Sequence, residues 1–224
     1  VSAVEREFIT DTVRRMFGFE TLLPGQLETL ACALRGEDVL TVLPTGGGKS
    51  LCYQLPALLR GGLAIVVSPL ISLMKDQVDA LKANGVRAAM YNSNLHPAEA
   101  RDVLERLHAG ELDLLYVAPE RVMRPGFLHS LEALDIALIA IDEAHCVSQW
   151  GHDFRPDYKF LSALKHNFPD VPLMALTATA TEAVRLDPTH APSWTGLAES
   201  LTLMAHMSLI PADEACARAR EALS

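Results

Sequence analysis

The chain has 224 residues, half of them hydrophobic and about a fifth charged, which suits one α/β domain with a small appended segment. No apolar run reaches the roughly 18–20 residues that span a bilayer, and the first residues lack the features of a signal peptide, so we expect a cytoplasmic protein. The net charge of −9 argues against tight DNA binding by the whole surface, but it leaves room for a local groove. The four cysteines lie far apart without a Cys-x-x-Cys pair, which argues against a zinc site and a disulfide framework.

Two helices are expected first, from about Ala3 to Phe17 and from near Pro24 to Gly36, because glycine is typical of helix ends and proline of helix starts. Short, wholly apolar runs then alternate with helical stretches. Strands are predicted at 38–43, 63–68, 87–91, 113–117, 136–141 and 173–176, and helices at 50–59, 71–84, 97–109 and 157–167. This alternation predicts a doubly wound parallel sheet whose ligands lie at the carboxyl ends of the strands.

The pattern changes after residue 181, where no further strand is predicted. Helices are expected at 191–207 and 211–223, and Trp194, Leu197 and Leu201 recur at helical spacing. The pair resembles a tetratricopeptide helix pair, although an α-hairpin packed on the main domain remains an alternative. We therefore divide the chain into an α/β domain at 1–181 and a short C-terminal helical hairpin at 182–224.

A glycine-rich segment at 44–50 lies between a predicted strand and a predicted helix, the context of a phosphate-binding loop. Glycines let backbone N–H groups turn toward phosphate oxygens, and the helix N-terminus adds its positive dipole. Lys49 can reach the β- and γ-phosphates, and the Ser50 hydroxyl can ligate Mg²⁺. A chance glycine-rich turn is the alternative. The expected nucleotide-binding residues are Thr45, Gly46, Gly47, Gly48, Lys49 and Ser50.

An acidic motif, Asp142-Glu143-Ala144-His145, follows the apolar run at 136–141. A carboxylate at the tip of a buried strand is costly unless it meets a cation, so Asp142 is expected to hold Mg²⁺ through water. Glu143 can then orient and deprotonate the attacking water. His145 is a plausible link to neighbouring loops. These residues predict ATP hydrolysis.

Six segments carry a family resemblance in a fixed order. They are PTGGGKS at 44–50, SPLISLMKDQV at 68–78, YVAPER at 116–121, DEAH at 142–145, CVSQWGHDFRP at 146–156 and ALTATA at 175–180. Together they resemble the first RecA-like domain of RecQ-type superfamily 2 helicases over roughly residues 5–181. The segment at 146–156 separates this type from other DEAH-type helicases. The resemblance implies a P-loop ATPase with ATP and Mg²⁺ as cofactors.

The same resemblance implies 3′ to 5′ movement on single-stranded or partly duplex DNA, with roles in DNA repair and recombination. Phe19 matches a position that stacks on adenine and Gln26 one that reads its edge, whereas Leu23 stands where the family often has arginine. A core position for Phe19, buried packing for Trp150 and a loop role for His152 are the alternatives. The implied DNA-binding and coupling residues are Ser68, Lys75, His145, Gln149, Trp150, His152, Phe154, Arg155, Thr177 and Thr179.

A motor of this type uses a second RecA-like lobe, which supplies an arginine to the transferring phosphate. The resemblance stops near residue 181, so we expect the chain to be an incomplete motor that binds nucleotide, hydrolyses it slowly and does not unwind DNA. Two alternatives stay open. One is an enzyme that borrows an arginine from another chain, and the other is a nucleotide-dependent DNA-binding module that docks a protein partner through 182–224.

Overall fold

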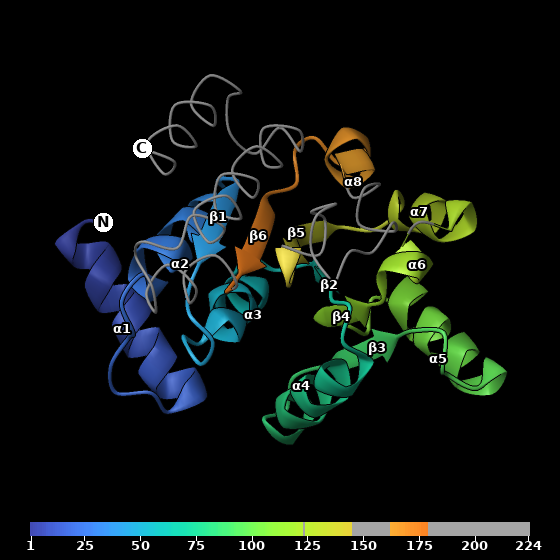
Figure 1. The fold of residues 1–224 in the computed structure, drawn as a ribbon, viewed down its shortest axis with the longest axis horizontal. Coiled ribbons are helices and arrows are strands. Elements are labelled where there is room, and N and C mark those ends of the chain that lie inside the picture. Colours follow the sequence, from blue (N-terminus) through green and yellow to red (C-terminus); the bar gives the residue numbers. More distant parts are fainter. Residues whose placement is uncertain (123, 145–161, 179–224) are drawn as a thin grey trace, which may run out of the picture.

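The computed structural model describes residues 1–122, 124–144 and 162–178 (Figure 1). These residues build a six-stranded sheet in the order β1-β6-β5-β2-β4-β3, and every pairing is parallel. The strands are β1 (Val39–Val42), β2 (Leu63–Val67), β3 (Ala88–Tyr91), β4 (Leu114–Val117), β5 (Ile136–Ile141) and β6 (Leu173–Thr177). The predicted parallel α/β sheet is therefore confirmed, with each strand within two residues of its expected position.

The helices within the described ranges are α1 (Ala3–Phe17), α2 (Gln26–Arg35), α3 (Lys49–Arg60), α4 (Ile71–Ala83), α5 (Pro97–His108), α6 (Pro119–Val122), α7 (Pro125–Leu131) and α8 (Ser162–Asn167). The first helix has its expected bounds because Ser2 and Glu5 form a capping box and Gly18 ends the helix in the left-handed conformation. The second begins two residues after Pro24, at Gln26. The sequence analysis missed α6 and α7.

Helices cover both faces of the sheet, because successive side chains of each strand point to opposite sides. In β2, Leu63, Ile65 and Val67 join a buried cluster with residues of α5, α7 and α8. The alternate positions, Ala64 and Val66, join a second cluster with residues of α3 and α4. In Figure 1, α5 and α7 lie on the right of the view, and α2 and α3 lie on the left.

A further layer lies outside α3. Ile9 and Val13 of α1, Leu30 of α2, and Leu51 and Leu55 of α3 form a third buried cluster. At roughly 1.5–3 kcal/mol for each fully buried large aliphatic side chain, this cluster anchors α2 and α3 firmly to one another. It therefore holds the start of α2 beside the start of α3, which is where the glycine-rich segment lies.

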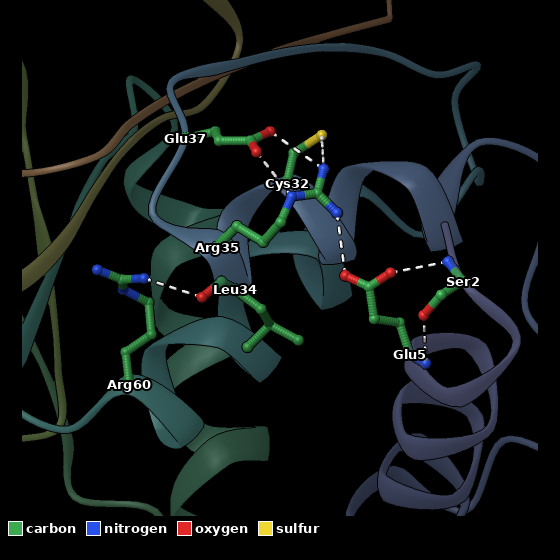
Figure 2. A network of polar contacts seen from close by, with 7 residues as sticks. All are labelled: Ser2, Glu5, Cys32, Leu34, Arg35, Glu37 and Arg60. Atoms are coloured by element: carbon green, nitrogen blue, oxygen red, sulfur yellow. Dashed lines mark hydrogen bonds and ion pairs between the residues drawn. The ribbon is translucent and has the colours of Figure 1, made fainter.

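Polar contacts tie the amino-terminal ends of the strands to the helices. Arg60, at the end of α3, donates to the carbonyl oxygens of Ala33, Leu34 and Ala137 at 3.0–3.3 Å. Figure 2 shows the bond to Leu34. Figure 2 also shows the Arg35 guanidinium between the carboxylates of Glu5 and Glu37. Arg60 thus joins α2, α3 and β5, and Arg35 joins α1 to α2.

Several expectations fall on residues 145–161 and 179–224, which lie outside the described residues. They include the helical hairpin at 182–224 and the first five residues of the helix expected at 157–167, whose remainder is α8. Within the described ranges, no helix is both long enough and apolar enough to cross a membrane. Of the four cysteines, Cys32 and Cys52 lie in the described ranges, and both are free.

Candidate functional site

The glycine-rich segment leaves β1 and turns into α3 through backbone conformations that only glycine adopts freely. Gly46 and Gly48 have φ angles of +78° and +68°. A Cβ at Gly47 would stand 2.8 Å from the Pro44 carbonyl oxygen, and one at Gly48 would collide with the Gln26 amide. The loop is therefore a cradle with no room for side chains, and it leads into the N-terminus of a 12-residue helix. This is the geometry of an anion-binding loop.

Asp142 lies at the carboxyl end of β5 with only 6% of its surface exposed, and its N–H donates to the Val67 carbonyl at 2.8 Å. The pKa of this carboxyl is raised to about 6, mainly by burial and also by the charge of Glu143, whereas the Glu143 N–H, the Lys49 ammonium and the Ser68 hydroxyl lower it. The glycine-rich loop follows β1 and Asp142 follows β5, so both lie at the same edge of the parallel sheet. Burying a charged carboxylate costs free energy, and a cation bound beside it would lower that cost.

Glu143 has a φ angle of +50°, which places a non-glycine residue in the left-handed region. Its N–H donates to the Asp142 carboxylate at 3.0 Å. Such a conformation costs on the order of 1 kcal/mol and persists where the surroundings impose it, often at functional sites. This turn sets the direction in which the chain leaves β5 after Asp142.

Hydrogen bonds extend from Ser50 into the core through three side chains to which the sequence analysis assigned no role. Gln77 of α4 donates to the Ser50 hydroxyl at 2.8 Å. Gln54 of α3 donates to Gln77 at 2.7 Å and to the Tyr116 hydroxyl at 3.1 Å. Only the four-residue spacing of Ser50 and Gln54, which places both on one face of α3, hinted at this group. Gln77 is 27 residues from Ser50, so no local pattern could have found it.

Of the two residues expected to contact adenine, Gln26 contacts the glycine-rich loop. The Gln26 side chain is 3% exposed, donates to the carbonyl of Gly48 at 3.1 Å and accepts from the N–H of Leu23 at 2.8 Å. Phe19 is 51% exposed and stacks parallel on Phe17, with ring centroids 6.5 Å apart. A core position for Phe19 is therefore wrong. Gln26 supports the loop directly, whereas Phe19 offers an open aromatic face.

The expected DNA-binding and coupling residues are only partly described. Ser68 and Thr177 are buried at the carboxyl ends of β2 and β6, on the same edge of the sheet as Asp142. Lys75 is exposed on α4. The remaining ones, His145, Gln149, Trp150, His152, Phe154, Arg155 and Thr179, lie outside the described residues.

Comparison with known proteins decides the family. A family model described as DEAD/DEAH box helicase matches residues 23–186, which is most of the chain and includes the glycine-rich loop and the acidic motif. The chain belongs to the DEAD/DEAH box helicase family. Membership of this family implies that the chain uses ATP.

Among DEAD/DEAH box helicases, the chain is similar to RecQ-type proteins. It is 50% identical over 184 residues to the ATP-dependent DNA helicase RecQ of Haemophilus influenzae, covering 82% of this chain and 30% of that protein. It is 47% identical over 180 residues to the probable ATP-dependent DNA helicase RecS of Bacillus subtilis, covering 80% and 36% respectively. The chain spans about a third of the length of these curated relatives.

Solved helicase structures share the fold. The helicase MrfA bound to DNA and AMPPNP has a TM-score of 0.61 at 20% identity, covering 80% of this chain and 27% of that one. A hypothetical ATP-dependent RNA helicase from Sulfolobus tokodaii has a TM-score of 0.59 at 21% identity, covering 84% and 56%. At these identities the likeness extends to the RecA-like fold of the DEAD/DEAH box helicases and no further.

Proposed function

We propose that this chain is the first, ATP-binding lobe of a RecQ-type 3′ to 5′ DNA helicase, with residues 1–181 as the lobe and 182–224 as a helical tail. The observation that carries the proposal is the pairing of the glycine cradle with Asp142. Lys49 opens α3 and acts electrostatically on a carboxyl that is buried at the tip of β5. Identity of about 50% to proteins named RecQ supports the DNA helicase class.

The residue roles follow from the chemistry of phosphoryl transfer. Backbone N–H groups of Thr45, Gly46, Gly47 and Gly48 would hold the phosphates, with Lys49 as a point charge on the β- and γ-phosphates. The Ser50 hydroxyl and the Asp142 carboxylate would hold Mg²⁺, and both are oxygen donors of the kind that this ion prefers. When bound, the ion neutralises charge on the phosphates. Glu143 would orient the attacking water and accept its proton.

Adenine would lie against the open ring face of Phe19, near Gln26. The Gln26 amide accepts from the N–H of Leu23 and donates to the carbonyl of Gly48. A base bound at Gln26 would therefore act directly on the phosphate loop. Leu23, which is 44% exposed, would contribute apolar contact and no hydrogen bond.

Single-stranded or partly duplex DNA would bind at the carboxyl edge of the sheet. Ser68, Lys75 and Thr177 belong to segments of that edge, and we assign the rest of the contact to His145, Gln149, Thr179 and the loop that contains Trp150, His152, Phe154 and Arg155. Aromatic stacking contributes about 1–3 kcal/mol for each base and does not depend on sequence. Because the chain has a net charge of −9, binding should rest on these local contacts and weaken steeply with salt.

Unwinding uses two lobes that move against each other, and the facing lobe supplies the arginine that stabilises the transferring charge. Residues 1–181 account for one lobe. We therefore expect the isolated chain to bind Mg-ATP and to hydrolyse it slowly, without separating strands. We place such a lobe in DNA repair and recombination, by resemblance to the RecQ type.

The test is ATP turnover by the purified chain with and without single-stranded DNA, beside binding of a fluorescent ATP analogue. Glu143→Gln serves as the catalytic blank and Lys49→Ala as the binding blank. Nucleotide binding that falls roughly 100-fold in Lys49→Ala supports the proposal, and turnover that DNA stimulates above the Glu143→Gln blank would show a competent motor. Undiminished nucleotide affinity in Lys49→Ala would overturn the phosphate-loop assignment. A defined protein partner bound through 182–224 would favour the interaction-module alternative.

A further inference from the structure

We propose that Gln77 is a positioning residue for the Ser50 hydroxyl, and that through it helix α4 sets how well the site holds a divalent cation. The proposal rests on the function proposed above and adds a residue from outside the phosphate loop. Gln77 lies on α4, 27 residues beyond Ser50, and its amide nitrogen donates to Ser50 Oγ at 2.8 Å. This is a direct hydrogen bond from a different helix to the expected metal ligand.

The direction in which the Gln77 amide points is held from behind. Its oxygen accepts from the Gln54 amide at 2.7 Å and faces the Tyr116 hydroxyl at 3.5 Å. Gln54 donates to Tyr116 as well, at 3.1 Å, so the three side chains form a closed group. With its oxygen engaged by these donors, the Gln77 amide is left with its nitrogen facing Ser50.

The group is buried, which gives its geometry weight. Tyr116 is 1% exposed and Gln54 8% exposed, and Tyr116 packs edge-on against Tyr53 with ring centroids 6.3 Å apart. Polar groups away from water are costly to leave unpaired, so such a network strongly favours one arrangement. Gln77 is therefore fixed between the rigid core of the sheet and the phosphate loop.

The bond to Ser50 has a chemical consequence. A serine hydroxyl has two lone pairs and one proton. An N–H donor on one lone pair leaves the other lone pair for a cation and leaves the proton free to be donated elsewhere. Gln77 thus holds Ser50 in the state that a metal ligand requires, whereas an acceptor at that position would take the proton and turn the hydroxyl.

The neighbours of Gln77 on α4 show why the helix as a whole takes part. Met74, Val78 and Leu81 are buried in the cluster that α4 shares with α3 and the sheet. Gln77 lies between them, partly buried, and carries the polar contact from this helix to Ser50. A displacement of α4 relative to α3 would therefore change the hydrogen bond between the Gln77 amide and the Ser50 hydroxyl.

The test compares four proteins: the wild-type chain, Gln77→Met, Gln54→Met and Val78→Ala. Methionine matches glutamine in length but lacks the amide. Val78→Ala loosens the packing of the same helix and leaves the amide in place, so it is the matched control for a purely structural effect. The measurement is binding of fluorescent ADP, titrated with Mg²⁺ and repeated in EDTA, with the melting temperature of each protein as a check on folding.

We expect Gln77→Met to raise the Mg²⁺ concentration that gives half-maximal ADP binding about three- to tenfold, which corresponds to the loss of one hydrogen bond. Binding of ADP in EDTA should be unchanged. Gln54→Met should shift this Mg²⁺ concentration less in the same direction, because Gln77 loses one anchor but keeps its bond to Ser50. Val78→Ala should follow the wild type. Excess Mg²⁺ should restore binding in Gln77→Met. If Gln77→Met does not fold, Gln54→Met alone decides.

A wild-type Mg²⁺ dependence in the folded Gln77→Met or, failing that, in Gln54→Met would overturn the proposal. So would a shift of equal size in Val78→Ala, because the effect would then come from packing. If the wild-type chain itself showed no Mg²⁺-dependent nucleotide binding, the proposed function would fail and this inference with it. That outcome is distinct, since it appears before any variant is compared.

Discussion

Charged groups at the two edges of the sheet differ in how they are compensated. At the amino edge, Asp38 accepts from the Lys165 ammonium at 2.9 Å and from the N–H of Leu173 at 2.8 Å, and Lys165 also donates to the Val171 carbonyl. Arg60 is matched by three carbonyl oxygens. At the carboxyl edge, the buried Asp142 carboxyl keeps a raised pKa of about 6, mainly because burial opposes its charge.

The same contrast appears in the buried polar atoms that lack a hydrogen-bond partner in the described part of the chain. Two of them, Asn92 Nδ2 and Arg121 Nε, belong to segments that follow β3 and β4 at the carboxyl edge. The left-handed Glu143 follows β5 on that edge as well. The amino edge is therefore assembled for stability, whereas the carboxyl edge carries charge and strain that a ligand can relieve.

The largest expected effect at the carboxyl edge is on catalysis. Glu143→Gln keeps the shape of the side chain but removes the base that would accept a proton from water. We expect nucleotide affinity to stay within about twofold and the residual turnover to fall about 10²–10⁴-fold, the usual weight of general-base catalysis. Single-turnover hydrolysis measures this directly. Turnover equal to that of the wild type would remove Glu143 from the mechanism.

Loss of the loop cation should be the next largest effect. Lys49→Ala removes a charge-assisted contact to phosphate, and we expect ATP affinity to fall roughly 100-fold. Lys82→Ala, at the far end of α4, is the control and should bind as the wild type does. Calorimetry of both variants with ATP measures the difference. Equal affinities would show that nucleotide does not bind at this loop.

At the amino edge, disruption should cost stability alone. Asp38→Ala leaves the Leu173 N–H without its acceptor and removes the carboxylate partner of the partly buried Lys165 ammonium, which keeps its bond to the Val171 carbonyl, so we expect the free energy of unfolding to fall by about 2–3 kcal/mol. The exposed pair Arg87–Asp113 is a matched control, and Arg87→Ala should cost under about 1 kcal/mol. Urea unfolding measures both. Equal costs would contradict the contrast between a structural and a superficial ion pair.

At the carboxyl edge, we expect the removal of a charged group to increase the free energy of unfolding, whereas at the amino edge it should decrease it. The pKa of Asp142 is raised from its ordinary value to about 6, so its ionised form costs stability above that pH, and the cost disappears once the carboxyl is protonated in both the folded and unfolded states. Asp142→Asn should therefore stabilise the metal-free chain by about 1–3 kcal/mol at pH 7.5 and by little below about pH 4. Melting in EDTA across this range measures it. A destabilised variant at pH 7.5 would mean that the carboxylate is well solvated or fully paired.

Local sequence signals were sufficient wherever the structure follows from neighbouring residues. The bounds of α1 follow from a capping box at Ser2 and a glycine at position 18, and the strands follow from short apolar runs. The glycine cradle could be recognised because only glycine tolerates its backbone angles. The Asp142 and Glu143 roles remain predictions, as do those of the residues at 145–161 and 179.

Other features were decided by tertiary contacts. The order of the strands places β6 and β5 between β1 and β2, which no local pattern specifies. The short helices α6 and α7 escaped prediction because four and seven residues are too few for a periodic signal.

The sequence by itself thus determined the parallel α/β class and the family and predicted the phosphate loop, because each depends on the backbone preferences and the order of short segments. Tertiary structure alone decided which distant side chains meet: Gln77 with Ser50, and Asp38 with Lys165. The physical reason is that hydrogen bonds and charge interactions act through space over a few ångströms. Their partners are set by how helices pack on the sheet, and that packing is a property of the whole fold.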